Sequence, residues 1–235
     1  MSPHPETPPS PYVVSYLTIR KGVGLLAILL PVVLVAGLAL IFGEDHLEPS
    51  ISDYYYTKMG GYFVGTLCAV TLFLYCYKGY ALIDRVTCRL AGVFALGIAF
   101  FPASPAPLYN VLAIDYKNWV ETVHFTSAAL LFATLAFISL FLFTRTDDLA
   151  SLQANPRKRR RNIVYVVCGI VMLAAVLGIL AYFLFFERDT TLHPVFFLET
   201  IALWAFGVSW LTKGQFLLPD RGGISPGSPP GTPRA

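Results

Sequence analysis

The chain of 235 residues is 56% hydrophobic and only 13% charged, with a mean hydropathy of +0.63. Soluble domains carry about 25% charged residues. Half that share, together with apolar runs near 20 residues, indicates a multi-span membrane protein and leaves no room for a soluble domain. The four cysteines lie in apolar runs and form no C-x-x-C pair, which argues against a disulfide framework or a cysteine metal site.

Both ends of the chain are predicted to be disordered tails. Residues 1–19 are rich in proline and have no apolar period, and residues 215–235 are rich in proline, glycine and serine. The segment between them, residues 20–214, is the predicted transmembrane domain.

Six apolar segments of this domain are predicted to be transmembrane helices. At a rise of 1.5 Å per residue, about 20 helical residues cross the hydrocarbon core of a bilayer. The segments run from Val23 to Phe42, Gly60 to Tyr77, Thr87 to Phe101, Trp119 to Phe143, Ile163 to Phe186 and Pro194 to Leu211. The expected fold class is therefore all-α, a polytopic membrane helix bundle with six transmembrane helices.

Two glycines in the second segment, Gly61 and Gly65, form a GxxxG pair. Such a pair lets a second helix approach closely, so it is a candidate surface for a homo-oligomer. The alternative is the ordinary abundance of glycine in membrane helices.

The basic residues predict the orientation in the membrane. With six spans, fourteen of the 17 Lys and Arg residues fall on the side of the two chain ends, and only Lys58, Lys117 and Arg188 fall on the other. The positive-inside rule then places both termini in the cytoplasm. The run from Arg157 to Arg161 adjoins the fifth span, so we interpret it as an anchor on anionic lipid rather than a nucleic-acid site.

Acidic and histidine side chains gather on the opposite, outer side. Their depth in the predicted helices should bring Asp53, His124 and Glu199 into one layer that faces the bundle interior, because ionisable groups that face lipid are costly. We expect Asp53 and His124 to lie within direct or one-water hydrogen-bond reach. The candidate pocket residues are Ser50, Ser52, Asp53, Tyr54, Glu121, His124, His193 and Glu199.

Three interpretations of this polar layer remain open. The first is an interfacial network in which Asp53 caps the second span while His124 and Glu199 bridge helices. The second is a pocket for a lipid headgroup or a small amphiphile. The third is a metal-dependent hydrolase in which His124, His193 and Asp53 bind zinc and the metal activates water.

The segment from Pro49 to Asp53 resembles the P-x-I-S-D element that follows the first span in the damage-regulated autophagy modulator family. This six-span family includes Golgi proteins that remodel GPI lipids, and the chain is also similar to bacterial six-span proteins of unknown function. His124 at the start of the fourth span and Glu199 in the sixth fit the likeness, whereas Tyr54 stands where the family often has glycine. The resemblance implies topology and a bacterial inner (plasma) membrane location more than an activity.

A fainter likeness is to ceramidase-like membrane hydrolases, which hold zinc with Ser, Asp and three His. Their last span carries an H-x-x-x-H pair, and here His193 is followed by Phe197 at that spacing. The expected function is therefore a lipid-associated integral membrane protein that has an outward-facing polar pocket, with membrane lipids as partners, no nucleic acid and no cofactor. A metal-dependent, ceramidase-like lipid hydrolase that uses zinc is the alternative.

Overall fold

A computed structural model describes residues 11–77, 79, 81–103, 118–145, 156–186 and 192–218. These residues are helical with short connections and contain no strand. The elements in chain order are α1 (Pro11–Phe42), the 3-10 turn η1 (Ser52–Tyr56), α2 (Gly60–Cys76), α3 (Leu82–Phe100), α4 (Asn118–Phe137), the π-helix η3 (Ile138–Leu142), α6 (Pro156–Phe185) and α7 (Pro194–Lys213).

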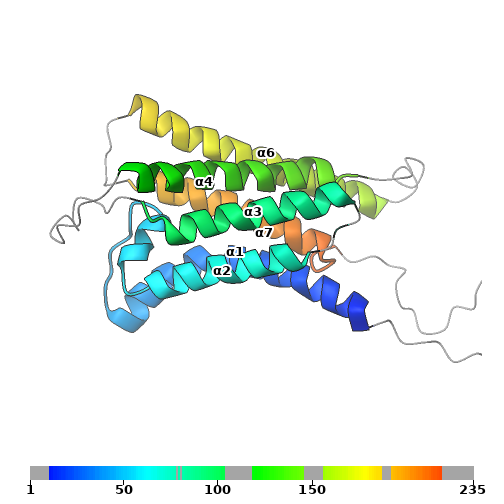
Figure 1. Cartoon of the computed structure of the whole chain (residues 1–235), viewed down its shortest axis with the longest axis horizontal. Coiled ribbons are helices and arrows are strands. Elements are labelled where there is room, and N and C mark those ends of the chain that lie inside the picture. The colour runs from blue at the N-terminus through cyan, green and yellow to red at the C-terminus, as the bar shows by residue number, and fades with distance from the viewer. Residues whose placement is uncertain are drawn as a thin grey trace, which may run out of the picture.

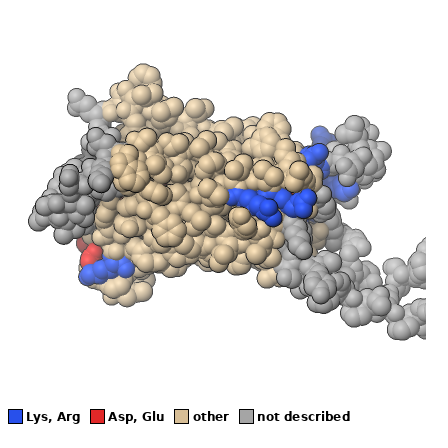
Figure 2. Space-filling model, viewed as in Figure 1, with Lys and Arg blue, Asp and Glu red and all other residues tan. Residues whose placement is uncertain are grey.

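The helices lie side by side and alternate in direction along the chain (Figure 1). One end of the bundle therefore collects the start of α1 and the end of α7, and the other collects η1 and the start of α7. We call the first the basic end, because it carries Arg20, Lys21, Arg85, Arg89, Arg145, Lys213 and the run 157–161. We call the second the acidic end, because it carries Glu44, Asp45, Glu48, Asp53, Glu121 and Glu199. Figure 2 shows the broad uncharged band that separates the two on the visible face.

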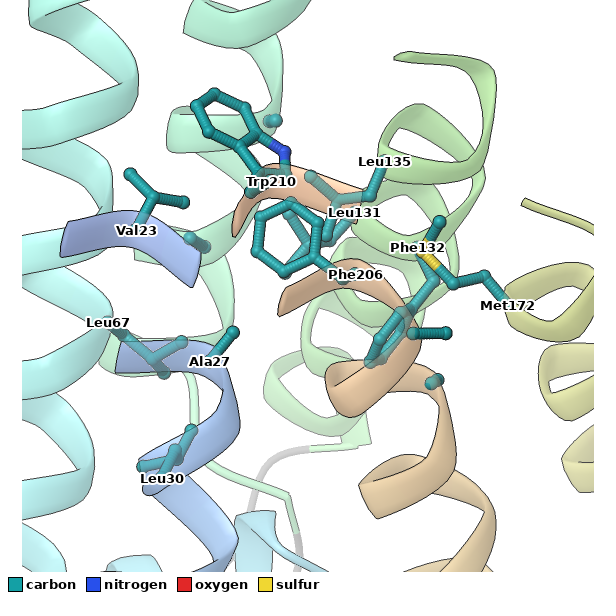
Figure 3. Packing of buried hydrophobic residues seen from close by; sticks show 14 of the residues in the cluster. Val23, Ala27, Leu30, Leu67, Leu131, Phe132, Leu135, Met172, Phe206 and Trp210 are labelled. Atoms are coloured by element: carbon teal, nitrogen blue, oxygen red, sulfur yellow. The ribbon is translucent and has the colours of Figure 1, made fainter. Parts of the chain in front are cut away.

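Helix α7 is the most enclosed of the strongly apolar helices. In its most apolar stretch 56% of the residues are buried, against 28–33% in α1, α4 and α6. Figure 3 shows Phe206 and Trp210 of α7 meeting side chains of α1 and α4 in the core. The other helices expose many large apolar side chains, including Leu72, Ile170 and Leu184, as expected for surfaces that face lipid.

Four helices are long and apolar enough to cross a membrane: Leu17–Phe42 of α1, Trp119–Leu142, Pro156–Phe185 and Pro194–Lys213. Of the two remaining helices, α2 is apolar but has only 17 residues, and α3 carries Asp84, Arg85 and Arg89. The all-helical, membrane-type architecture expected from the sequence is thus confirmed.

Three helices begin earlier than the apolar pattern indicated. Helix α1 starts at Pro11, inside the segment assigned to a disordered tail, and α6 starts at Pro156, so the basic run 157–161 is helical. Proline is favoured in the first helical turn because its missing N–H would have no partner there. Helix α3 starts at Leu82 instead of Thr87, and the Asp84 carboxylate accepts a hydrogen bond from the Ala81 N–H at 3.0 Å.

Helices α1 and α7 cross in contact at two glycines. A Cβ atom on Gly207 would lie 2.8 Å from the Gly24 carbonyl oxygen, and one on Gly24 would lie 2.9 Å from the Gly207 carbonyl oxygen. Near this crossing the Trp204 indole N–H donates to the Ile28 carbonyl at 3.2 Å. Gly61 and Gly65 behave differently: a Cβ on either would meet no described atom within 4 Å, so this pair faces out of the bundle.

Helix α4 continues into a single π-helical segment, η3, near the basic end. There the Ser139 hydroxyl donates to the Tyr165 carbonyl of α6 at 2.8 Å and lies 2.7 Å from the Ser209 hydroxyl of α7. Both serines are at most 1% exposed. The π-helix thus places the Ser139 hydroxyl where its hydrogen bonds link η3 to both α6 and α7.

Candidate functional site

The loop between α1 and α2 docks on the first two turns of α7 at the acidic end. The Phe196 N–H, one of the N-terminal amides of α7 without an intrahelical partner, donates to the Pro49 carbonyl at 3.1 Å. The Ile51 N–H donates to the Glu199 carboxylate at 2.6 Å. Two hydrogen bonds therefore hold the backbone of the P-x-I-S-D segment to α7, one at the Pro49 carbonyl and one at the Ile51 N–H.

Ser50, Ser52 and Asp53 form a compact hydrogen-bonded group within this loop. The Ser50 hydroxyl donates to the Asp53 carboxylate at 2.9 Å, lies 2.9 Å from the Ser52 hydroxyl and accepts the Asp53 N–H at 3.2 Å. Asp53 is 9% exposed. Burial raises the pKa of the Asp53 carboxyl to about 6; the Ser50 hydrogen bonds oppose the shift and the Glu48 carboxylate adds to it.

Tyr54 is fully buried beside the same part of α7. Its ring lies 6.2 Å from the Phe196 ring, and burial raises the pKa of its phenol to about 12. By distance and angle the Tyr54 hydroxyl makes no hydrogen bond to a described residue, although the Glu48 backbone lies near enough to oppose the rise in its pKa. A buried hydroxyl in that state is expensive, because its hydration is lost without replacement.

Two further side chains, at the start of α7, also have a buried polar atom that makes no hydrogen bond to a described residue. The Thr200 hydroxyl and the His193 Nδ1 atom are buried and have no partner within the described part of the chain. His193 precedes the helix in a left-handed conformation, with φ of 45°. Positions 193, 196 and 200 recur on one helical face. We define the acidic-end cluster as Ser50, Ser52, Asp53, Tyr54, His193, Glu199 and Thr200.

His124 and Glu121 belong to a neighbouring part of the acidic end. His124 of α4 is 2% exposed, and its Nδ1 pairs with the Phe101 carbonyl at the end of α3 at 2.8 Å. The Tyr56 hydroxyl donates to the Ala103 carbonyl at 2.5 Å, so η1 and α4 hold the same short segment after α3. Glu121 lies one turn before His124 and is partly buried.

Asp53 and His124, which we expect to lie within direct or one-water hydrogen-bond reach, make no direct hydrogen bond to each other, and a bridge through one water stays a prediction. Each side chain holds a nearby group, the Ser50 hydroxyl or the Phe101 carbonyl, because unpaired backbone carbonyls and hydroxyls at this depth need partners too. Asp53 also does not cap α2: the residue before that helix is Met59, whose N–H donates to the Thr57 hydroxyl at 3.1 Å.

The described residues contain no group of three or more His, Cys, Asp or Glu side chains that could hold a metal ion. The trio considered for zinc, His124, His193 and Asp53, is not brought together as a ligand set. The metal-dependent hydrolase thus gains no support from the geometry.

Thr200 and the backbone groups of Pro49 and Ile51 were missed by the sequence reasoning. A threonine two turns into an apolar helix carries no signal of its own. Its position next to Glu199, on the face of His193, was the available clue.

No family model, curated protein or solved structure matches this chain.

Proposed function

We propose that the protein is a six-span integral membrane protein, with both termini in the cytoplasm, that binds the polar headgroup of a membrane lipid through the acidic-end cluster. The observation that carries the proposal is the set of three buried polar atoms without partners, on Tyr54, His193 and Thr200. Buried polar groups in proteins are nearly always hydrogen-bonded, so three on adjoining elements indicate a place where a ligand completes the bonding.

The chemistry of the cluster favours an amine-bearing headgroup. Glu199 lies close enough to Asp53 to be subject to its charge, and together the two carboxylates suit an ammonium group. The Tyr54 and Thr200 hydroxyls can donate to the phosphate or ester oxygens of the same lipid. A zwitterionic ethanolamine phospholipid supplies both parts, and the acidic end lies at the depth of such headgroups in a bilayer.

The test removes, one at a time, the two buried hydroxyls that have no hydrogen-bond partner among the described residues. Tyr54→Phe and Thr200→Val keep side-chain shape, so the fold should persist, and loss of an unpaired buried hydroxyl should leave stability unchanged or slightly higher. Delipidated full-length protein is titrated with phosphatidylethanolamine and phosphatidylcholine, and binding is measured by native mass spectrometry. We expect wild type to prefer the ethanolamine lipid and both variants to bind it several-fold more weakly.

Tyr55→Phe is the matched control, because it removes a hydroxyl from the neighbouring, only partly buried tyrosine. It should bind as wild type does. Equal lipid binding by wild type, Tyr54→Phe and Thr200→Val would overturn the proposal.

A further inference from the structure

Helix α3 presents an apolar face to the outside of the bundle. It packs between α2 and α4, so the side chains that contact neither neighbour point outward (Figure 1). The large exposed apolar residues of α3 are Leu82, Ile83, Val86, Leu90, Val93 and Phe100. In the six-span arrangement proposed above, lipid covers such a surface.

Two exposed arginines, Arg85 and Arg89, lie on this same face. Spacings of three, four and seven residues place them on the side of the helix that carries Leu82 and Val86. Figure 2 shows positive charge over the start of α3, reaching from the basic end onto the otherwise uncharged face. Arg89 lies seven residues, or about 10 Å, beyond the first residue of the helix. Ionisable side chains in membrane-spanning helices nearly always face the bundle interior, so two that face outward indicate a partner from the lipid.

The described part of the chain supplies no ion pair to either arginine. The side chains of Arg85 and Arg89 make no salt bridge or hydrogen bond to a described residue. The neighbouring Asp84 is buried, and its carboxylate accepts the Ala81 N–H at 3.0 Å on the inner side of the helix. Like charges four residues apart on a helix repel each other, so an anion between the two guanidinium groups would be stabilising.

A tyrosine of α2 positions the deeper of the two arginines. The Arg89 guanidinium lies 5.2 Å from the centre of the Tyr75 ring, and that ring is itself 55% exposed. A cation–π contact orients the guanidinium but gives its N–H groups no acceptor oxygen. Leu72, one turn before Tyr75, is 65% exposed and continues the apolar surface along α2. Oriented donors therefore adjoin an apolar surface that extends toward the middle of the bundle.

We propose that the outer surface of α2 and α3 near the basic end binds an anionic phospholipid, whose phosphate pairs with Arg85 and Arg89 while its acyl chains lie along the adjoining apolar side chains. We call this surface the α2–α3 face; it consists of Leu72, Tyr75, Arg85, Val86, Arg89 and Val93. Guanidinium groups match phosphate oxygens in charge and geometry. A soluble anion would gain nothing from the apolar residues, whereas a lipid uses both parts of the surface. The site requires α3 to lie in the bilayer, but it does not depend on headgroup binding at the acidic-end cluster.

The test uses full-length, delipidated protein and compares phosphatidylglycerol with phosphatidylcholine by native mass spectrometry. We expect wild type to prefer phosphatidylglycerol. Arg85→Gln and Arg89→Gln should each weaken its binding by about three- to tenfold, and the double variant by more, because each loses a charge-assisted hydrogen bond. Binding of phosphatidylcholine should not change. Arg89→Lys keeps the charge and should bind phosphatidylglycerol more tightly than Arg89→Gln does.

Arg160→Gln is the matched control, because it removes one exposed positive charge at the same end but from α6; it should bind phosphatidylglycerol as wild type does. Equal losses in Arg160→Gln and Arg89→Gln would show only diffuse attraction and would overturn the proposal. Displacement of the lipid by inorganic phosphate at equal ionic strength would also overturn it, as would a lipid-free dimer that Arg89→Gln dissociates, since a second copy would then cover the face. Tyr54→Phe should keep the phosphatidylglycerol preference, which separates this site from the acidic-end cluster.

Discussion

The Asp53 carboxyl group is buried in the loop between α1 and α2. Its native pKa of about 6 lies above the ordinary value of 3.8, so between these values the folded protein binds a proton that the unfolded chain has released. Stability should therefore fall as pH rises from about 4 to 6 and then stay level. The difference between pKa values of 3.8 and about 6 corresponds to roughly 3 kcal/mol.

We predict that Asp53→Asn flattens this dependence. The amide is neutral at every pH and its oxygen can still accept from Ser50, so the variant should gain on the order of 1–2 kcal/mol over wild type at pH 7.5 and lose that advantage at pH 4. Unfolding in detergent at several pH values measures both curves. Asp45→Asn, at an exposed position, should follow wild type, and a wild-type stability that rises between pH 4 and 6 would contradict the assignment.

For the pair Asp53 and Glu199, the sequence predicted nearness but not the hydrogen-bond partners of either side chain. Asp53 and Glu199 were expected in one layer, and they do lie near one another across the loop–α7 contact. Their actual partners are the Ser50 hydroxyl and the Ile51 amide. Backbone partners carry no compositional signature, so side-chain chemistry alone could not predict that Asp53 and His124 make direct hydrogen bonds to other groups instead of to each other.

Among the elements, the α1–α7 crossing depends on two residues that have no side chain. We predict that Gly207→Ala destabilises the protein by about 1–3 kcal/mol, because the added Cβ would meet the Gly24 carbonyl at 2.8 Å, as well as the Ile28 side chain, and only separation of the helices relieves a backbone contact. Denaturant-induced unfolding in micelles measures the loss.

Gly65→Ala is the matched control for this prediction. A Cβ there meets no described atom within 4 Å, so intramolecular stability should be unchanged or higher. If the outward-facing pair Gly61 and Gly65 joins two copies of the chain, Gly65→Ile should lower the dimer fraction in chemical crosslinking without lowering monomer stability. An unaltered dimer fraction would exclude this face as the interface.

The hydrogen bonds at the π-helical segment predict that one buried serine, Ser139, contributes more to stability than the other, Ser209. Ser139 donates its proton to the Tyr165 carbonyl, so Ser209 must donate to Ser139. Ser139→Ala removes both hydrogen bonds and leaves the buried Ser209 hydroxyl without an acceptor. Ser209→Ala removes one hydrogen bond and leaves no buried donor without an acceptor. We predict losses of about 2 and about 1 kcal/mol respectively, measured by unfolding; the reverse order would refute the donor assignment.

The sequence predicted the starts of α2 and α7 closely, since Gly60 and Pro194 follow polar stretches. It could not predict η3, because one extra residue in a helical turn leaves the apolar composition of Ile138–Leu142 unchanged. It also placed the start of α3 too late, since charged residues at a helix end look like a loop when only hydropathy is considered.

For the whole molecule, the separation of basic and acidic ends predicts the orientation. Single cysteines are introduced as Asp45→Cys and Arg160→Cys, both exposed, in a chain whose four native cysteines are replaced. A membrane-impermeant thiol reagent applied to intact cells should label the first and spare the second, because basic ends are retained in the cytoplasm. Labelling of Arg160→Cys alone would invert the orientation and place the acidic-end cluster in the cytoplasm.

The unequal helix lengths have a consequence for the surrounding lipid. Helix α2 has 17 residues, or about 26 Å at 1.5 Å per residue, whereas α6 on the other side of the bundle has 30 and reaches about 45 Å (Figure 1). A bilayer core is about 30 Å thick, so if α2 spans the membrane as proposed, lipid beside it must compress while α6 projects beyond the core. We expect a lopsided hydrophobic mismatch that tilts the bundle, draws short-chain lipids to the α2 side and makes the protein less stable in vesicles of increasing acyl-chain length.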